Sequence, residues 1–257
     1  MMPIALRERA QRLQLHGLID HWSDVADAPW VASLLDWEET ERARRSQERR
    51  LRNAQLGRFK PLADFDWQWP AHCDRAAIES LARLDFLHEG GNAVLLGPNG
   101  VGKTTIARNI AHQAVLAGHT VLFTTAGAML GDLAAQDSDG ALKRRLNRYV
   151  RPTLLLIDEL GYLSYSNRHA DLLFQIISRR YEQKSVLVTT NRPFAEWGEV
   201  FPNAACVVSL IDRLIHHAEI IAIDGESYRL KEARERAGNH PGVRPRVNTP
   251  SRRSTPR

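Results

Sequence analysis

The stretch Gly97-Pro98-Asn99-Gly100-Val101-Gly102-Lys103-Thr104 matches the phosphate-binding pattern G-x-x-x-x-G-K-[ST]. A short apolar run, 92–96, precedes it, and a helical pattern, 103–117, follows it. The glycines let backbone amides curl toward phosphate oxygens, and the following helix directs its N-terminal dipole at the same anion. We expect Lys103 to bind the β- and γ-phosphates, Thr104 to ligate Mg²⁺, and Thr105 to adjoin the nucleotide. The sequence therefore predicts a site for ATP with Mg²⁺.

Polar residues follow two later apolar strands. In LLLIDEL, 154–160, Asp158 is placed to hold Mg²⁺, and Glu159 to act as the base that activates water. Glu159 could instead cap the next segment. Asn191, which ends VLVTTN, could orient the attacking water, although Asn-x-Pro is also a turn signal. Together with the glycine-rich loop, these residues indicate ATP hydrolysis.

The segment 74–235 alternates short apolar strands with helices. This alternation predicts an α/β fold with a parallel sheet flanked by helices. Helices are predicted at 75–87, 103–117, 126–135, 140–149 and 169–183, with another beginning near Ser209. Strands are predicted at 92–96, 120–124, 153–157 and 185–189, followed by a hairpin of 220–223 and 227–230.

The first 58 residues predict a small all-helical N-terminal domain that binds DNA or a partner. Its helices are expected at 3–15, 18–26 and from Pro29 to Gly57. The aromatic and proline-containing stretch 59–73 is predicted to be a connector whose aromatics pack on the next domain. Residues 236–257 lack apolar content and are predicted to be a disordered basic tail.

The chain has 257 residues and a formal charge of +5, with arginines concentrated near residues 42–58 and in the tail. Such clusters indicate a polyanionic partner, and Arg45, Arg49 and Arg52 are the candidate DNA contacts. The alternative is a solvated helix face. Cys73 and Cys206 are expected to be reduced thiols. The N-terminus lacks the apolar run of a signal peptide, and no stretch could span a membrane, so a cytoplasmic location is expected.

The order of these motifs resembles that of AAA+ ATPases. The stretches YLSYSNRHADLLFQIISRRYE, TTNRPFAEWGEVFPNAACVVSLIDRLIHHAEIIAIDGESYRLK and LLDWEETERARRSQERRLRNAQLGRFKPLADFDW resemble the IstB-like transposition helper ATPases of insertion sequences. The resemblance covers residues 6–235. It implies that Arg213, in IDRL, is an arginine finger for a neighbouring subunit, that Arg229, in SYR, is a second sensor, and that Asn191 is the first.

The resemblance also implies a task and partners. Such proteins form homo-oligomers with ATP sites shared between subunits, bind double-stranded target DNA, and recruit the transposase encoded by the same element. The first alternative is the similar family of replicative helicase loaders. A small-molecule kinase and a non-hydrolysing DNA scaffold are further alternatives, and the acid Glu159 argues against the kinase.

Overall fold

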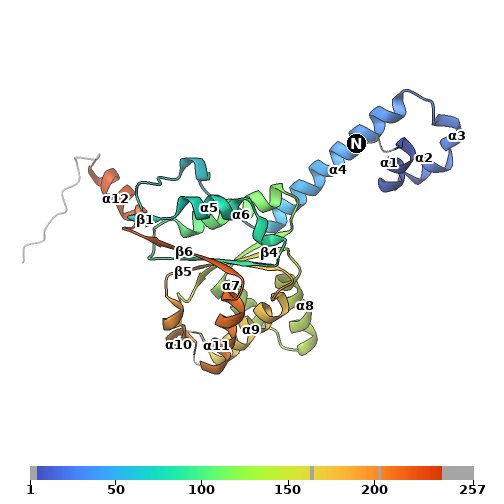
Figure 1. Cartoon of the computed structure of the whole chain (residues 1–257). Coiled ribbons are helices and arrows are strands. Elements are labelled where there is room, and N and C mark those ends of the chain that lie inside the picture. Colours follow the sequence, from blue (N-terminus) through green and yellow to red (C-terminus); the bar gives the residue numbers. More distant parts are fainter. Residues whose placement is uncertain (1–4, 163–164, 202–203, 239–257) are drawn as a thin grey trace, which may run out of the picture.

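The computed structural model describes residues 5–162, 165–201 and 204–238, and its centre is a six-stranded sheet (Figure 1). The strands are β1 (His72–Cys73), β2 (Asn92–Leu96), β3 (Val121–Thr125), β4 (Leu154–Leu160), β5 (Ser185–Thr190) and β6 (Ala218–Asp224). Their order is β1-β6-β2-β5-β4-β3. The pairing is parallel except between β1 and β6. This arrangement confirms the predicted α/β fold.

Helices cover both faces of the sheet. The helices from residue 75 onward are α5 (Arg75–Ala82), α6 (Lys103–Leu116), α7 (Ala126–Ala134), α8 (Asp139–Val150), α9 (Asn167–Arg180), α10 (Trp197–Val200), α11 (Ala204–Ile215) and α12 (Tyr228–Gly238). The described residues also form 3₁₀ turns at η1 (Leu62–Asp64), η2 (Asp85–Leu87) and η3 (Phe194–Glu196), of which η1 precedes α5. Helices α5 and α6 lie on one face, and α7 to α11 on the other (Figure 1).

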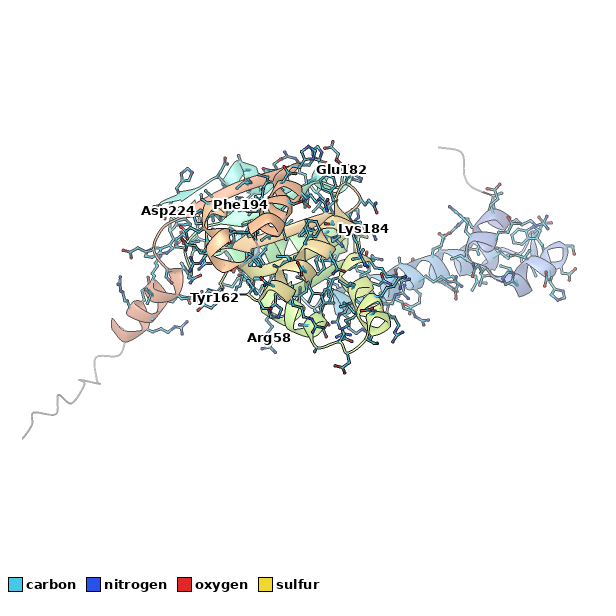
Figure 2. All side chains as sticks on the ribbon, turned by 90° about the horizontal axis from the view of Figure 1, so that it is seen from below. Arg58, Tyr162, Glu182, Lys184, Phe194 and Asp224 are labelled. Atoms are coloured by element: carbon cyan, nitrogen blue, oxygen red, sulfur yellow. The ribbon has the colours of Figure 1, made fainter. Side chains whose placement is uncertain are left out.

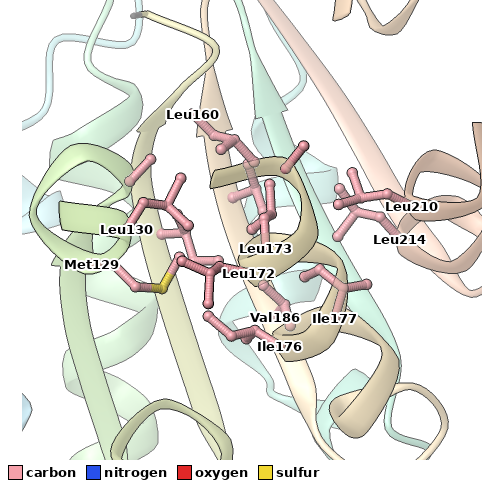
Figure 3. Close-up of a cluster of buried hydrophobic side chains, with 14 of the residues drawn as sticks. Met129, Leu130, Leu160, Leu172, Leu173, Ile176, Ile177, Val186, Leu210 and Leu214 are labelled. Atoms are coloured by element: carbon pink, nitrogen blue, oxygen red, sulfur yellow. The ribbon is translucent and has the colours of Figure 1, made fainter. Parts of the chain in front are cut away.

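The strands are apolar on both faces because both faces are covered. In β4, Leu154 and Leu156 pack with α5 and α6, whereas Leu155 and Ile157 pack with α7 to α11. Figure 3 shows the second of these cores, where Leu173 of α9 lies among buried side chains of neighbouring elements. This double burial fixes the strand ends, and with them the residues that follow each strand.

Several helices begin at side chains that cap the first backbone amides. Asp74, Thr125 and Ser138 accept hydrogen bonds from the amides of Ala77, Ala128 and Ala141. At α9, Ser166 and His169 form a reciprocal capping box. The role of His169 in this structure is therefore to begin α9.

The N-terminal helices are α1 (Leu6–Arg12), α2 (His16–Asp20), α3 (Trp22–Val25) and α4 (Trp30–Ala54). Helix α4 projects away from the sheet and carries the first three at its far end (Figures 1 and 2). There Leu13, Val31 and Leu35 form a small buried cluster. The other end of α4 places Ala54 in the core beneath α6. None of the described helices is long and apolar enough to cross a membrane.

The predicted hairpin of 220–223 and 227–230 is wrong. Residues 228–230 begin α12, and β6 is paired with β2 on one side and β1 on the other. Residues 227–230 do not pair with β6 because His72 and Cys73 already pair with its free edge. The amide of Tyr228 instead donates to the carbonyl of Gly100, 3.0 Å away.

Three helix boundaries also differ from the prediction. The helix predicted at 75–87 ends at Ala82, because Leu84 adopts a left-handed φ of 70° before η2. Helix α11 begins at Ala204 rather than near Ser209. Helix α12 extends to Gly238, past the predicted start of the tail, and 239–257 lie outside the described residues. Cys73 is a free thiol, whereas the side chain of Cys206 lies outside the description.

Candidate nucleotide-binding site

The glycine-rich loop lies between the end of β2 and the start of α6. Gly100 has a φ of 89°, and a Cβ there would lie 2.1 Å from the hydroxyl of Ser227. At Gly102, with a φ of 99°, a Cβ would lie 2.5 Å from the ring of Phe65. Both positions combine left-handed backbone with a close neighbour, so only glycine fits. The loop is therefore enclosed by Phe65, which precedes it in the sequence, and by Ser227, which follows β6.

Lys103 extends back over this loop. Its Nζ donates to the carbonyl of Gly97 at 2.6 Å and to that of Pro98 at 2.7 Å. The residue is 8% exposed. Burial lowers its pKa to about 8, Asp158 and Glu159 oppose the shift, and the charge of Arg229 adds to it. When a nucleotide binds, its charged phosphate oxygens would replace these two neutral carbonyls as the acceptors of Lys103.

Asp158 is the buried acid at the end of β4. Its Oδ1 accepts from the hydroxyl of Thr104 at 2.9 Å and from that of Thr189 at 2.5 Å. The residue is 4% exposed. A hydroxyl and a carboxylate in contact are the hard oxygen ligands that Mg²⁺ prefers, so the residues present fit a magnesium ion.

Glu159 reaches the same pocket through an irregular strand end. Adjacent residues of a regular strand point to opposite faces, yet Asp158 and Glu159 both line the pocket. The β4–β5 register shifts between Ile157 and Leu160, and Glu159 has a φ of 60°. Its amide donates to the hydroxyl of Thr189 at 3.0 Å. This bulge leaves an exposed carboxylate beside a buried one.

Asn191 follows β5 and lines the pocket opposite the glycine-rich loop. Its Oδ1 is buried and has no hydrogen-bond partner among the described residues. An unpaired buried amide oxygen is uncommon, because its desolvation goes uncompensated. Asn191 therefore has a polar atom available for a bound molecule.

The pocket has a volume of about 520 Å³, a size typical of small-ligand sites. It gathers Lys103, Thr104, Thr105, Asp158, Glu159, Asn191 and Arg229, together with Asn99 to Gly102 of the loop. Gly97 and Pro98 contribute the carbonyls that bind Lys103. The structure thus brings together the residues that the sequence assigned to nucleotide binding, except Arg213.

The aromatic wall of this pocket was not predicted from the sequence. Phe65 and Trp69 of the connector line it, as does Tyr228 of α12. The indole of Trp69 donates to the carbonyl of Glu226 at 2.9 Å, and Lys231 pairs with Asp66 at 3.0 Å. The signal in the sequence is the aromatic and proline-containing stretch 59–73, whose aromatics are predicted to pack on the next domain.

Comparisons with known proteins identify the family of the chain. A family model described as IstB-like ATP binding protein matches residues 9–236. The chain belongs to the family of IstB-like ATP-binding proteins. A Geobacillus stearothermophilus protein of insertion sequence IS5376, named as ATP-binding, is 34% identical over 89% of this chain and 95% of its own. A Pseudomonas aeruginosa protein of IS21, also named as ATP-binding, is 40% identical over 76% of this chain and 73% of its own.

Solved structures show the same fold. DnaA from Aquifex aeolicus, bound to AMPPCP, has a TM-score of 0.55 and 21% identity over 72% of this chain and 56% of its own. DnaI has a TM-score of 0.55 and 21% identity over 66% of this chain and 93% of its own. This IstB-like chain is therefore an ATP-binding protein with an AAA+ fold, as the resemblance implied.

Arg213 lies away from the pocket of its own chain. It extends from α11 toward α9, where it donates to the hydroxyl of Ser178 and lies 4.8 Å from the ring centroid of Phe174. Arg229, on α12, is exposed and lines the pocket. The two late arginines of the IstB-like sequence are thus separated.

The candidate DNA contacts on α4 differ in their surroundings. Arg45 is paired with Glu41 at 2.6 Å. Arg49 and Arg52 are exposed and form no ion pair with a described residue. The positive charge of this helix is therefore partly neutralised in its middle and remains unbalanced near its C-terminal end.

Proposed function

We propose that this IstB-like protein hydrolyses ATP in sites shared between neighbouring subunits, assembles on duplex DNA, and assists the transposase of its insertion sequence. One observation carries the proposal. The described pocket contains the residues for phosphate and metal binding, a carboxylate base and a polar residue for water, whereas Arg213 lies elsewhere. A site that lacks its arginine in one chain is suited to completion by another.

Each pocket residue has a distinct role in the proposed reaction. Lys103 leaves its two carbonyl acceptors and binds the triphosphate. Thr104 and Asp158 would hold Mg²⁺, which when bound neutralises charge on the phosphate oxygens. Glu159 accepts a proton from the attacking water, and Asn191 orients that water through its unpaired amide oxygen.

The two arginines act on the phosphate charge. Arg229 binds the phosphates within its own chain, because it is exposed and already lines the pocket. Arg213 donates to the γ-phosphate of a neighbour, for which it leaves the hydroxyl of Ser178. A guanidinium binds planar oxygen pairs through two donors, which suits a transferring phosphoryl group.

The relatives support the choice of partners. Two relatives that are 34% and 40% identical over most of the chain are named for insertion sequences, whereas the likeness to DnaI concerns the fold. We therefore place a transposase, rather than a replicative helicase, as the partner. The N-terminal helices, which carry their own small core on a projecting α4, offer a separate surface for it.

Mixing two inactive variants tests the shared site. Glu159→Gln removes the base, and Arg213→Ala removes the donated guanidinium, so each alone should bind ATP and lose turnover. In a mixed assembly, a subunit with intact Glu159 can receive Arg213 from a neighbour of the other kind. Phosphate release on DNA should therefore reappear on mixing.

A matched control uses an exposed arginine outside the proposed site. Arg83 lies 4.0 Å from Asp85 at the end of α5, so Arg83→Ala should leave turnover unchanged. Full activity of Arg213→Ala alone, or two inactive variants that stay inactive when mixed, would show that sites are not completed between subunits.

A further inference from the structure

A second hollow, of about 870 Å³, lies where the C-terminal end of α4 meets the turns that precede β3, β4 and β5. Five basic residues line it: Arg50, Arg52, Arg148, Arg151 and Lys184. The other lining residues that the structure describes are neutral. In Figure 2, Lys184 lies on the side of the body from which α4 projects, away from Asp224 and Tyr162.

These cations lack acidic partners. None of the five forms an ion pair with a described residue, whereas in the middle of α4 Arg44 is paired with Glu41 at 2.8 Å and Glu48 at 2.5 Å. Neutral acceptors position them instead. Arg148 donates to the side-chain oxygen of Gln55 at 3.3 Å, and Lys184 donates to the carbonyl of Arg151. The hollow therefore keeps its positive charge.

Lys184 lies close to other positive charges, one of which, Arg151, also lines the hollow. The pKa of Lys184 is lowered, first by partial burial and then by the charges of Arg180 and Arg151. Like charges held close together cost free energy in the isolated chain, and a bound anion would relieve that cost.

The turns that carry the cations are held in place by Arg180. This residue is fully buried and donates five hydrogen bonds to backbone carbonyls. Four of these carbonyls lie in 149–153, which contains Arg151, and the fifth belongs to Ser185, next to Lys184. The cations thus sit on a fixed scaffold, which reduces the ordering cost of binding.

We propose that this hollow binds the phosphodiester backbone of duplex DNA. The inference rests on the proposed function, which requires DNA binding, and it assigns that binding to particular residues. Arginines and a lysine that lack acidic partners and have neutral polar neighbours are what backbone contact uses. The hollow lies at the N-terminal ends of β3, β4 and β5, whereas Asp158 and Asn191 lie at the C-terminal ends of β4 and β5. DNA and ATP therefore bind at opposite ends of the strands and do not compete.

The proposal predicts a weaker and less salt-dependent interaction when two exposed cations are neutralised. Each phosphate contact contributes about 0.9 to the slope of log K against log salt, which corresponds to about eightfold in affinity near 0.1 M salt. Arg148→Gln with Arg151→Gln should therefore weaken binding to a fluorescent duplex of mixed sequence by roughly fiftyfold and reduce the slope by about 2. Lys184→Gln, tested alone, should give about half of the change in slope.

The matched control removes the same charge from paired arginines. Arg44→Gln with Arg83→Gln should change affinity and slope little, because both residues face acids in the free protein. An equal loss in this control, or unchanged affinity and slope in Arg148→Gln with Arg151→Gln, would overturn the hollow as the DNA site. The assignment is also overturned if Arg148→Gln with Arg151→Gln loses affinity for RNA and retains it for duplex DNA.

Folding and the wider proposal are checked separately. ATP affinity and thermal melting of each variant should match the wild type, because the hollow is remote from the nucleotide pocket. If the wild-type protein with ATP fails to bind duplex DNA, the proposed function itself is wrong. If the wild type binds and the variants bind equally well, only the assignment to this hollow is wrong.

Discussion

The burial of Lys103 makes ATP affinity depend on pH. In the free protein the residue is 8% exposed, and its ammonium group donates hydrogen bonds to the carbonyls of Gly97 and Pro98. Burial therefore lowers the pKa to about 8 from the ordinary 10.5. A triphosphate beside the group favours its charged form and raises the pKa again. Above pH 8, nucleotide binding must then take up a proton.

The size of the effect follows from linkage. Because the pKa of Lys103 is higher in the complex than in the free protein, its charge contributes to ATP affinity. This contribution is fully present below the free-protein pKa and is lost as pH rises above it. If the complex restores the ordinary value of 10.5, affinity is nearly constant below about pH 7 and falls about tenfold between pH 7 and 9. That change is about 1.4 kcal/mol. The terminal phosphate contributes little, because its last proton leaves near pH 6.

The assay is calorimetric titration with a non-hydrolysable ATP analogue at fixed ionic strength and Mg²⁺. Buffers of different ionisation enthalpy should report uptake of about half a proton per site at pH 8. Lys103→Arg keeps its charge through this range, so its affinity, whatever its absolute value, should not fall with pH. The reasoning is refuted if this variant loses affinity with pH as steeply as the wild type, or if no proton is taken up.

Three further substitutions test the glycine-rich loop, the hydrogen bonds of Arg180 and the aromatic wall of the pocket. Gly100→Ala places a Cβ 2.1 Å from the hydroxyl of Ser227 on left-handed backbone, so ATP affinity should fall about tenfold in the same titration. Arg180→Met removes a donor from five carbonyls, of which that of Thr153 still accepts from the amide of Ser185, and should cost about 3 kcal/mol or more, seen as a melting temperature roughly 6–12 °C lower. Trp69→Ala removes part of the aromatic wall and the hydrogen bond to Glu226, and should weaken ATP binding about tenfold.

Each substitution has a counterpart elsewhere in the chain. Gly131→Ala meets open space within α7 and should be neutral or stabilising. Arg179→Met changes the exposed neighbour of Arg180, and Trp37→Ala changes a tryptophan that is 69% exposed on α4. Equal effects in a test variant and its counterpart would remove the structural explanation given for that site.

The phosphate loop was predictable because its signals are local. Strand, glycine-rich turn and helix follow one another without interruption, and the lysine and threonine lie inside the motif. The strands were equally clear, since burial on both faces gives continuous apolar runs such as Leu154 to Ile157. These features depend on neighbours in sequence.

Features that depend on distant neighbours were not predictable. The alternation in 220–230 favours a hairpin, but the edge of β6 is occupied by residues 72–73, more than a hundred positions earlier. The aromatic wall forms because the connector and α12 meet, through Lys231 and Asp66, across the pocket. The left-handed backbone of Glu159, which turns its carboxylate into the pocket, leaves no trace in the pattern LLLIDEL.

Two strands join the nucleotide pocket to the proposed DNA hollow. β4 begins a few residues after Arg151 and ends at the Asp158–Glu159 bulge, and β5 begins after Lys184 and ends at Thr190, next to Asn191. Each strand spans roughly 20 Å at about 3.3 Å per residue. A buried strand transmits a shift at one end to the other, because its close-packed neighbours do not yield. DNA held by Arg151 and Lys184 would thus act on the two residues that position water, and the left-handed bulge at Glu159 lies on that connection.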